Sequence, residues 1–223
     1  MTRAFMNQVD ELTQRLAVSA KDIQVMVDDD GLTFHIESGF DLRRLQEHTD
    51  GIAQDTQTIE DEVVSIIASH DAYNDDIQAL CALLKVSRGL GRVAQTASRI
   101  AERVHRLEKR SEPWFGRRLS PTLVRITSLL HEVLRAFGDR SDSTSRELRQ
   151  RVHDVEKEAT EVVRKLMRDA AHAGFNPPAA CSELFFLLDD VERMVEQGRS
   201  IALALVGRST PRAERRRAAC PVP

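Results

Sequence analysis

One stretch of the sequence repeats apolar residues at alternating steps of three and four. It consists of Leu83, Val86, Leu90, Val93, Ala97, Ile100, Val104 and Leu107. A heptad spacing of this kind places all of these side chains on one stripe of an α-helix. The stretch is therefore predicted to form a long helix that packs within a bundle.

The same pattern returns later in the chain at an offset of 101 residues. The second set is Leu184, Leu187, Val191, Met194, Gly198, Ile201 and Leu205, and only Arg208 breaks the series. Glu62-Val63-Val64 likewise matches Glu161-Val162-Val163 at an offset of 99. Repetition over this length indicates a duplicated unit. We therefore predict an all-α fold of six helices, arranged as two pseudo-repeated three-helix bundles.

Composition supports this fold class and excludes several kinds of partner. Aromatic residues make up only 4% of the 223 residues, which favours helices over a β-sandwich or barrel. The net charge of −3, from 30% charged residues, lacks the basic excess of a nucleic-acid-binding protein. No apolar run approaches the roughly 20 residues of a membrane-spanning helix, and the N-terminus lacks a secretion signal. We expect a cytoplasmic protein that is neither an integral membrane protein nor a nucleic-acid binder.

Turn-forming residues divide the chain into segments. Helices are expected from about Arg3 towards His35, from Asp41 to Ser69, through the Leu83–Leu107 stretch, and over about Thr122–Phe137, Ser143–Ala173 and Ala179–Val206. The domain organisation follows: a first three-helix bundle (1–110), a connector with two prolines (111–121), a second bundle (122–207) and a tail (208–223). The tail carries several arginines without apolar periodicity, so we expect it to be disordered. Its role is left open.

Several strings within this pattern resemble the PhoU family of phosphate-uptake regulators. Asp76-Ile77-Gln78 takes the place of the family's Asp-Leu-Arg, and Leu90-Gly91-Arg92-Val93-Ala94-Gln95 falls in step with its Leu-Glu-Arg-Ile-Gly-Asp. Ile100-Ala101-Glu102 takes the place of its Ile-Ala-Glu ending, and Val191-Glu192-Arg193-Met194-Val195-Glu196 is similar to the same motif in the second half. The resemblance covers about residues 5–207 and is that of a divergent member.

Glu-x-x-x-Asp pairs in that family are implicated in binding multinuclear metal clusters, and this chain departs from them. Gly91 and Gln95 replace both acidic residues of the first motif, so the first metal site is expected to be absent. Glu192 and Glu196 keep two carboxylates on one helical face of the second. The resemblance implies a single degenerate site for Fe, Mn or another divalent metal, with a solvated face as the alternative. Further ligands would have to come from Glu156, Glu158 or Asp189.

Two further features suggest binding surfaces. Ser87, Gly91, Ala94, Ser98 and Ala101 form a stripe of small residues beside the heptad positions. Another helix, from the other half or from a second subunit, could approach closely there; neutral drift of an abandoned site is the alternative.

Trp114, Arg117 and Arg118 combine an aromatic anchor with basic neighbours, as a partner-binding site would. The alternative is that Trp114 only holds the connector against its own bundle.

An enzymatic alternative rests on Glu102-x-x-His105 and Asp169-x-x-His172. Their spacing is similar to that of ligands in ferritin-like di-iron bundles, which need these side chains to point inward. Val104 and Leu107 hold the apolar stripe, so Glu102 and His105 are expected at its edge. No Gly-rich phosphate loop or activated-nucleophile motif is present. We therefore name no catalytic residue and expect no enzyme.

The PhoU resemblance implies a regulatory function. It points to a cytoplasmic adaptor that binds a phosphate ABC transporter component and a sensor histidine kinase. Such an adaptor would restrain uptake or signalling when phosphate is plentiful. A generic helical scaffold unrelated to phosphate is the alternative. The sequence leaves open whether the chain forms a homo-oligomer.

Overall fold

The computed structural model describes residues 3–27, 42–69, 74–108, 115–138, 142–172 and 178–206. They form six helices and no strand, which confirms the predicted all-α fold: α1 (Arg3–Val25), α2 (Leu42–Ser69), α3 (Asn74–Glu108), α4 (Phe115–Gly138), α5 (Asp142–His172) and α6 (Pro178–Val206). None of these described helices is both long and apolar enough to cross a membrane.

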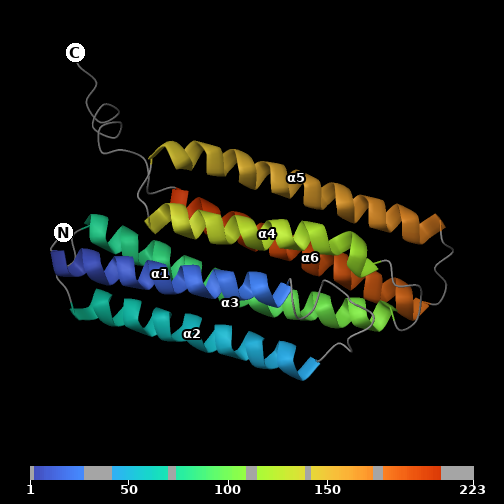
Figure 1. Cartoon of the computed structure of the whole chain (residues 1–223), viewed down its shortest axis with the longest axis horizontal. Coiled ribbons are helices and arrows are strands. Elements are labelled where there is room, and N and C mark those ends of the chain that lie inside the picture. Colours follow the sequence, from blue (N-terminus) through green and yellow to red (C-terminus); the bar gives the residue numbers. More distant parts are fainter. Residues whose placement is uncertain are drawn as a thin grey trace, which may run out of the picture.

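The helices lie side by side along the long axis of the molecule, with α2 and α5 at opposite edges (Figure 1). At the centre α3 packs against α6, and α1 packs against α4. Within each half, the third helix also packs against the first and second helices of its own half. Two copies of one unit related by an approximate twofold axis would make these contacts. The packing therefore agrees with the predicted duplication.

The heptad pattern correctly identifies the core. All eight apolar positions from Leu83 to Leu107 are buried. In the second half, the equivalent positions from Leu184 to Ile201 are buried as well. Buried residues of all six helices join in one continuous apolar cluster. Burial of this shared apolar surface holds the two halves together.

The fourth helix differs from its predicted bounds. It begins at Phe115 rather than near Thr122, so that Pro121 lies inside it. Proline removes one backbone donor and normally disfavours a helix interior. Pro121 is the seventh residue of α4 and lies in its second turn, and Thr122 and Leu123 directly after it are buried. The last residues expected in the first helix, 28–35, and the tail, 208–223, lie outside the described residues.

Candidate functional site

The two carboxylates singled out by the sequence, Glu192 and Glu196, lie on the exposed face of α6. They are four residues apart, which places them on the same side of the helix. Neither makes a hydrogen bond or ion pair with any residue that the structure describes. They are therefore available to a ligand from solution.

Each carboxylate that could complete a metal site there is already paired with an arginine. The pairs are Glu156 with Arg199 at 3.4 Å, Glu158 with Arg125, and Asp189 with Arg193 at 2.9 Å. Among the described residues, no group of three His, Cys, Asp or Glu side chains is placed to hold a metal ion. The described residues thus do not fit a multinuclear metal centre. A weaker site at Glu192 and Glu196 alone stays a prediction.

At the equivalent place in the first half, small residues bring two helices together. A Cβ added at Gly91 would lie 3.1 Å from Oγ1 of Thr56 in α2. One turn earlier, the buried Ser87 hydroxyl donates to the Thr56 carbonyl at 2.6 Å. At Gly91 the small-residue stripe is thus a packing surface, but it faces α2 of the same half. Thr56 of α2, and not a residue of the other half, is the neighbour at this position.

The close approach between the halves is at Gly89 instead. A Cβ at Gly89 would lie only 2.5 Å from Cγ1 of Ile201 in α6. Further along the same pair of helices, Oγ1 of Thr96 lies 3.4 Å from Oε1 of Gln197, its own equivalent 101 residues later. A residue that contacts its own equivalent must lie at the approximate twofold axis. The offset found in the sequence is therefore visible as a contact in space.

A cluster of ion pairs, which the sequence analysis missed, joins α3 to α6. Asp190 is only 4% exposed, and its two carboxylate oxygens accept hydrogen bonds from Arg99 at 3.1 Å and Arg103 at 2.9 Å. Arg103 also donates to Glu183 at 3.1 Å, and its guanidinium carbon lies 5.0 Å from the ring centre of Phe186. A buried carboxylate is expensive unless it is paired and hydrogen-bonded. These arginines supply that pairing across the boundary between the halves.

One sequence signal could have found this cluster. Asp190 lies between Leu187 and Val191 in the most apolar part of α6, next to the buried stripe. A charged residue at such a position needs a partner on the neighbouring helix. Periodicity alone does not show which helix packs next to Asp190. Arg99 and Arg103 of α3 could therefore not be predicted as its partners.

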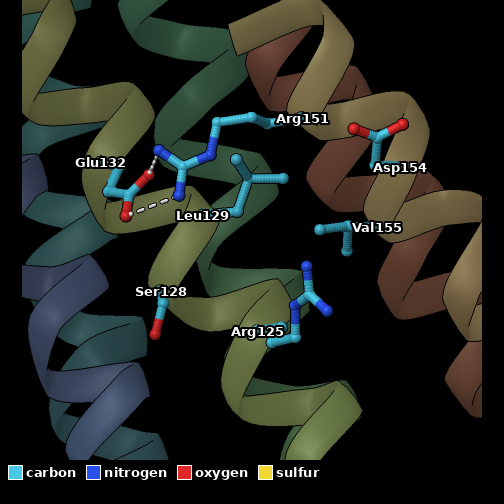
Figure 2. A pocket seen from close by; sticks show the side chains of 7 residues that line it. All are labelled: Arg125, Ser128, Leu129, Glu132, Arg151, Asp154 and Val155. Atoms are coloured by element: carbon cyan, nitrogen blue, oxygen red, sulfur yellow. Dashed lines mark hydrogen bonds and ion pairs between the residues drawn. The ribbon is translucent and has the colours of Figure 1, made fainter. Parts of the chain in front are cut away.

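A small cavity lies between α4 and α5 (Figure 2). Its volume is about 120 Å³, and its lining residues are Arg125, Ser128, Leu129, Glu132, Arg151, Asp154 and Val155. Arg151 contacts both carboxylate oxygens of Glu132, at 2.5 and 3.1 Å, and Arg125 pairs with Glu158. Ligand sites for organic cofactors are typically about 300 Å³ or more. This cavity can hold water or a small ion. The charges of its two arginines are already balanced by Glu132 and Glu158.

A carboxyl group on α1 is electrostatically perturbed. Partial burial and the nearby carboxylate of Asp55 raise the pKa of Asp22 above its usual value of 3.8, while His48 opposes the shift. All three residues lie on α1 and α2. Its neighbours on α1 and α2 and its partial burial therefore disfavour the charged form of Asp22.

The remaining predicted residues are placed as follows. Trp114 lies outside the described residues. The side chains of Arg117 and Arg118, in the first turns of α4, lie outside them as well, so the partner site at these three residues stays a prediction.

The di-iron alternative depends on Glu102. Its side chain is partly exposed and pairs with Arg106 at 3.7 Å, while Val104 and Leu107 are buried. Glu102 therefore lies at the edge of the apolar stripe, as expected, and does not point inward as a di-iron ligand would.

Comparison with known proteins gives one informative result. No protein-family model matches the sequence, and no curated protein matches it at a significant level. The crystal structure of PhoU from Pseudomonas aeruginosa is similar, with a TM-score of 0.68 and 20% sequence identity, over 92% of this chain and 95% of that chain. At this identity the likeness concerns the fold. The chain thus has a PhoU-like helical fold over nearly its whole length.

Proposed function

We propose that this chain is a non-enzymatic regulator of phosphate uptake and phosphate-responsive signalling. It acts in the cytoplasm by binding a phosphate transporter component, a sensor histidine kinase, or both. The observation that carries the proposal is the PhoU-like fold over 92% of the chain. The motif strings at residues 76–78, 90–95 and 191–196 support it, because they lie in the same order and spacing as in the family.

The mechanism that fits this arrangement is binding alone. Several charged side chains at the helix interfaces are engaged in structural ion pairs, such as Arg103 with Asp190 and Arg151 with Glu132. A partner would therefore bind to the exposed outer faces of the long helices. A regulator of this kind acts by holding partner surfaces in one arrangement, and it can shift their activity only by its differential affinity for their states.

The proposal is tested by deleting the gene in its native organism. Phosphate uptake and a phosphate-starvation reporter are measured in phosphate-rich medium, with complementation by the wild-type gene as the control. We expect uptake or reporter expression to rise in the deletion strain and to return on complementation. Unchanged uptake and unchanged reporter expression would contradict a role in phosphate regulation.

A direct binding measurement separates the regulator from a scaffold unrelated to phosphate. The purified full chain is titrated by calorimetry with the transporter's nucleotide-binding subunit and with the cytoplasmic part of the sensor kinase from the same organism. We expect at least one of the two to bind. If neither binds, with or without phosphate, the scaffold alternative is favoured.

Metal binding at Glu192 and Glu196 is a separate prediction. Two adjacent carboxylates hold a divalent cation weakly, so we expect Mn²⁺ to raise the melting temperature of the wild-type protein slightly at millimolar concentration. The Glu192→Gln, Glu196→Gln double variant should not respond, whereas a Glu156→Gln variant, which loses a carboxylate paired with Arg199, should respond normally. Equal responses of all three proteins would rule out this site. Two iron atoms per chain by elemental analysis would instead favour the di-iron alternative.

A further inference from the structure

We propose that the outer side of α5 is a docking surface for an acidic segment of a partner protein. The residues that form it are cationic and exposed: Lys157, Arg164, Lys165 and Arg168. Residues at these spacings lie on one side of an α-helix. We call these four residues the α5 basic row.

The fold leaves this side of α5 uncovered. Among the described helices, α5 packs against α4 and α6 only, and it lies at one edge of the bundle (Figure 1). The buried residues of α5 include Val155, Ala159, Val163 and Leu166, and helical spacing places them on the side opposite the α5 basic row. The four cations are therefore accessible to another molecule.

Three of these cations have no partner within the part of the chain that the structure describes. Most of the described arginines form ion pairs with the chain's own carboxylates, as Arg151 does with Glu132. Lys157, Arg164 and Lys165, by contrast, make no ion pair or hydrogen bond with a described residue. An acidic partner would thus not have to displace an existing carboxylate from these three side chains.

The duplication of the chain provides an internal comparison for the α5 basic row. The equivalent positions in α2, 99 residues earlier, are Thr58, Ser65, Ile66 and Ser69. None of these residues is charged, although α2 packs against α1 and α3 as α5 packs against α4 and α6. The same unit therefore folds without cations at this place, so packing does not account for the row in the second half.

The charge of this surface selects the chemistry of its partner. Glu161 lies among the four cations, and the other carboxylate of this stretch, Glu158, is paired with Arg125. Four cations against one unpaired carboxylate attract an acidic surface and repel a basic one. The row is also opposite in sign to the net charge of −3 of the whole chain.

A protein segment fits this surface better than a membrane or a nucleic acid does. A helix that binds a membrane surface inserts a broad apolar side, whereas that side of α5 is buried in the bundle and Met167 is the one large apolar side chain that its described residues expose. Nucleic acids require a wider basic excess. The α5 basic row extends over about 16 Å of helix, which matches about three turns of a partner helix that carries one carboxylate per turn.

The exposure of the cations sets the expected strength. Exposed ion pairs are individually weak and are screened by salt. We therefore expect a dissociation constant on the order of 100 μM at low salt. This recognition does not depend on whether the chain regulates phosphate uptake.

The test is fluorescence anisotropy with a labelled, alanine-rich helical peptide of about 20 residues that carries one or two glutamates per turn. The full chain is titrated up to about 500 μM in about 20 mM salt and again in about 300 mM salt. We expect binding at low salt and at least about tenfold weaker binding at high salt. The same peptide with glutamine in place of every glutamate should not bind.

A triple variant of the chain locates the surface. Lys157→Gln, Arg164→Gln and Lys165→Gln together remove the three unpaired cations and should weaken peptide binding at least about tenfold. Arg168 is left unchanged. Circular dichroism melts should match the wild type, because all three side chains are exposed.

The matched control removes the same amount of charge elsewhere. Lys21→Gln, Lys85→Gln and Arg92→Gln together change three exposed cations of α1 and α3, so the net charge falls as it does in the α5 variant. This control variant should bind the acidic peptide as the wild type does.

Each outcome bears on the proposal. A wild-type chain that does not bind the acidic peptide at low salt would overturn the inference. So would binding that the α5 variant retains, or binding that the control variant loses equally. Vesicles of about 30% phosphatidylglycerol in phosphatidylcholine are tested in parallel. Vesicle binding that the α5 variant loses, without peptide binding by the wild type, would replace the protein partner by a membrane surface.

Discussion

Gly89 and Gly51 both lie inside α-helices, but only one of them is needed for packing. A Cβ at Gly89 would meet Ile201 at 2.5 Å, whereas nothing lies within 4 Å of a Cβ at Gly51. Overpacking costs about 1 to 3 kcal/mol, while replacing a helical glycine by alanine gains about 1 kcal/mol. We expect Gly89→Ala to lower the free energy of unfolding and Gly51→Ala to raise it, as measured by urea denaturation. In an Ile201→Ala background, which lacks the atoms that clash, Gly89→Ala should no longer be destabilising. Stabilisation by Gly89→Ala in the otherwise wild-type chain would contradict the close approach.

Asp22 makes the stability of the protein depend on pH. Because its pKa is raised above 3.8 in the folded state, the folded state holds its proton more tightly than the unfolded state does. Stability therefore falls as the pH rises from about 3.8 through the folded pKa, and the loss persists at higher pH. We expect Asp22→Asn to be more stable than the wild type at pH 7 and equally stable at pH 3. Equal stabilities at both pH values, measured by denaturation, would show that the shift is absent.

Between elements, the α3–α6 contact uses two different chemistries at its two ends. At one end Gly89 packs closely against Ile201. At the other end Asp190 forms ion pairs with Arg99 and Arg103. Removing one partner of a buried ion pair leaves an uncompensated charge and costs about 3 to 5 kcal/mol. Asp190→Ala removes the buried member of the cluster and leaves two partly exposed arginines, of which Arg103 keeps Glu183. We therefore expect a smaller loss in the free energy of unfolding, about 1.5 to 3 kcal/mol, the value of hydrogen bonds to a charged group.

The matched control for Asp190→Ala is Glu132→Ala, which breaks the more exposed pair with Arg151 between α4 and α5. Exposed pairs contribute about 0 to 1 kcal/mol, so this variant should change stability much less. Equal losses in the two variants would show that burial of Asp190 does not set the energy of its pair.

The elements themselves could largely be predicted from the sequence. Heptad spacing identified the buried side of α3 and α6. The offset of 101 residues makes Thr96 and Gln197 equivalent positions, and only the structure shows that they are in contact. The predicted start of α4 was wrong because the two prolines and the glycine of residues 111–121 were interpreted as a connector, whereas the helix begins at Phe115 and includes Pro121. Helical periodicity shows which side of a helix is buried, but it does not show which helix covers that side. For this reason the stripe that contains Gly91 could be interpreted as an interface between halves or subunits, or as a site lost by neutral drift, whereas Gly91 faces α2.

The candidate site was less predictable than the fold. Glu192 and Glu196 were correctly expected on one helical face, but the arginine partners of Glu156, Glu158 and Asp189 depend on how α4, α5 and α6 are arranged. The exposure of Phe185 and Phe186, 65% and 49%, likewise depends on which helices pack against α6. Ion pairs and exposed aromatics are properties of the assembled bundle.

At the scale of the whole molecule, the continuous core predicts that neither half is stable alone. The buried faces of α3 and α6 cover each other, so a fragment of residues 1–110 would expose one side of its longest apolar stripe. We expect the full chain to unfold in a single calorimetric transition and the 1–110 fragment to show no cooperative melt, or to associate with the separately produced 122–207 fragment. A 1–110 fragment that melts cooperatively as a monomer would show that the predicted bundles are independent domains.

The contact of Thr96 with Gln197 also bears on the history of the molecule. If two identical copies of one unit paired at this place, the same residue would lie on both sides of the contact. A single mutation would then change both sides at once. Once the two units became one gene, each side could change by itself. Gly89 and Asp190 are equivalent positions at the offset of 101 residues, and they differ in this way: Gly89 makes a tight apolar contact, whereas Asp190 forms ion pairs.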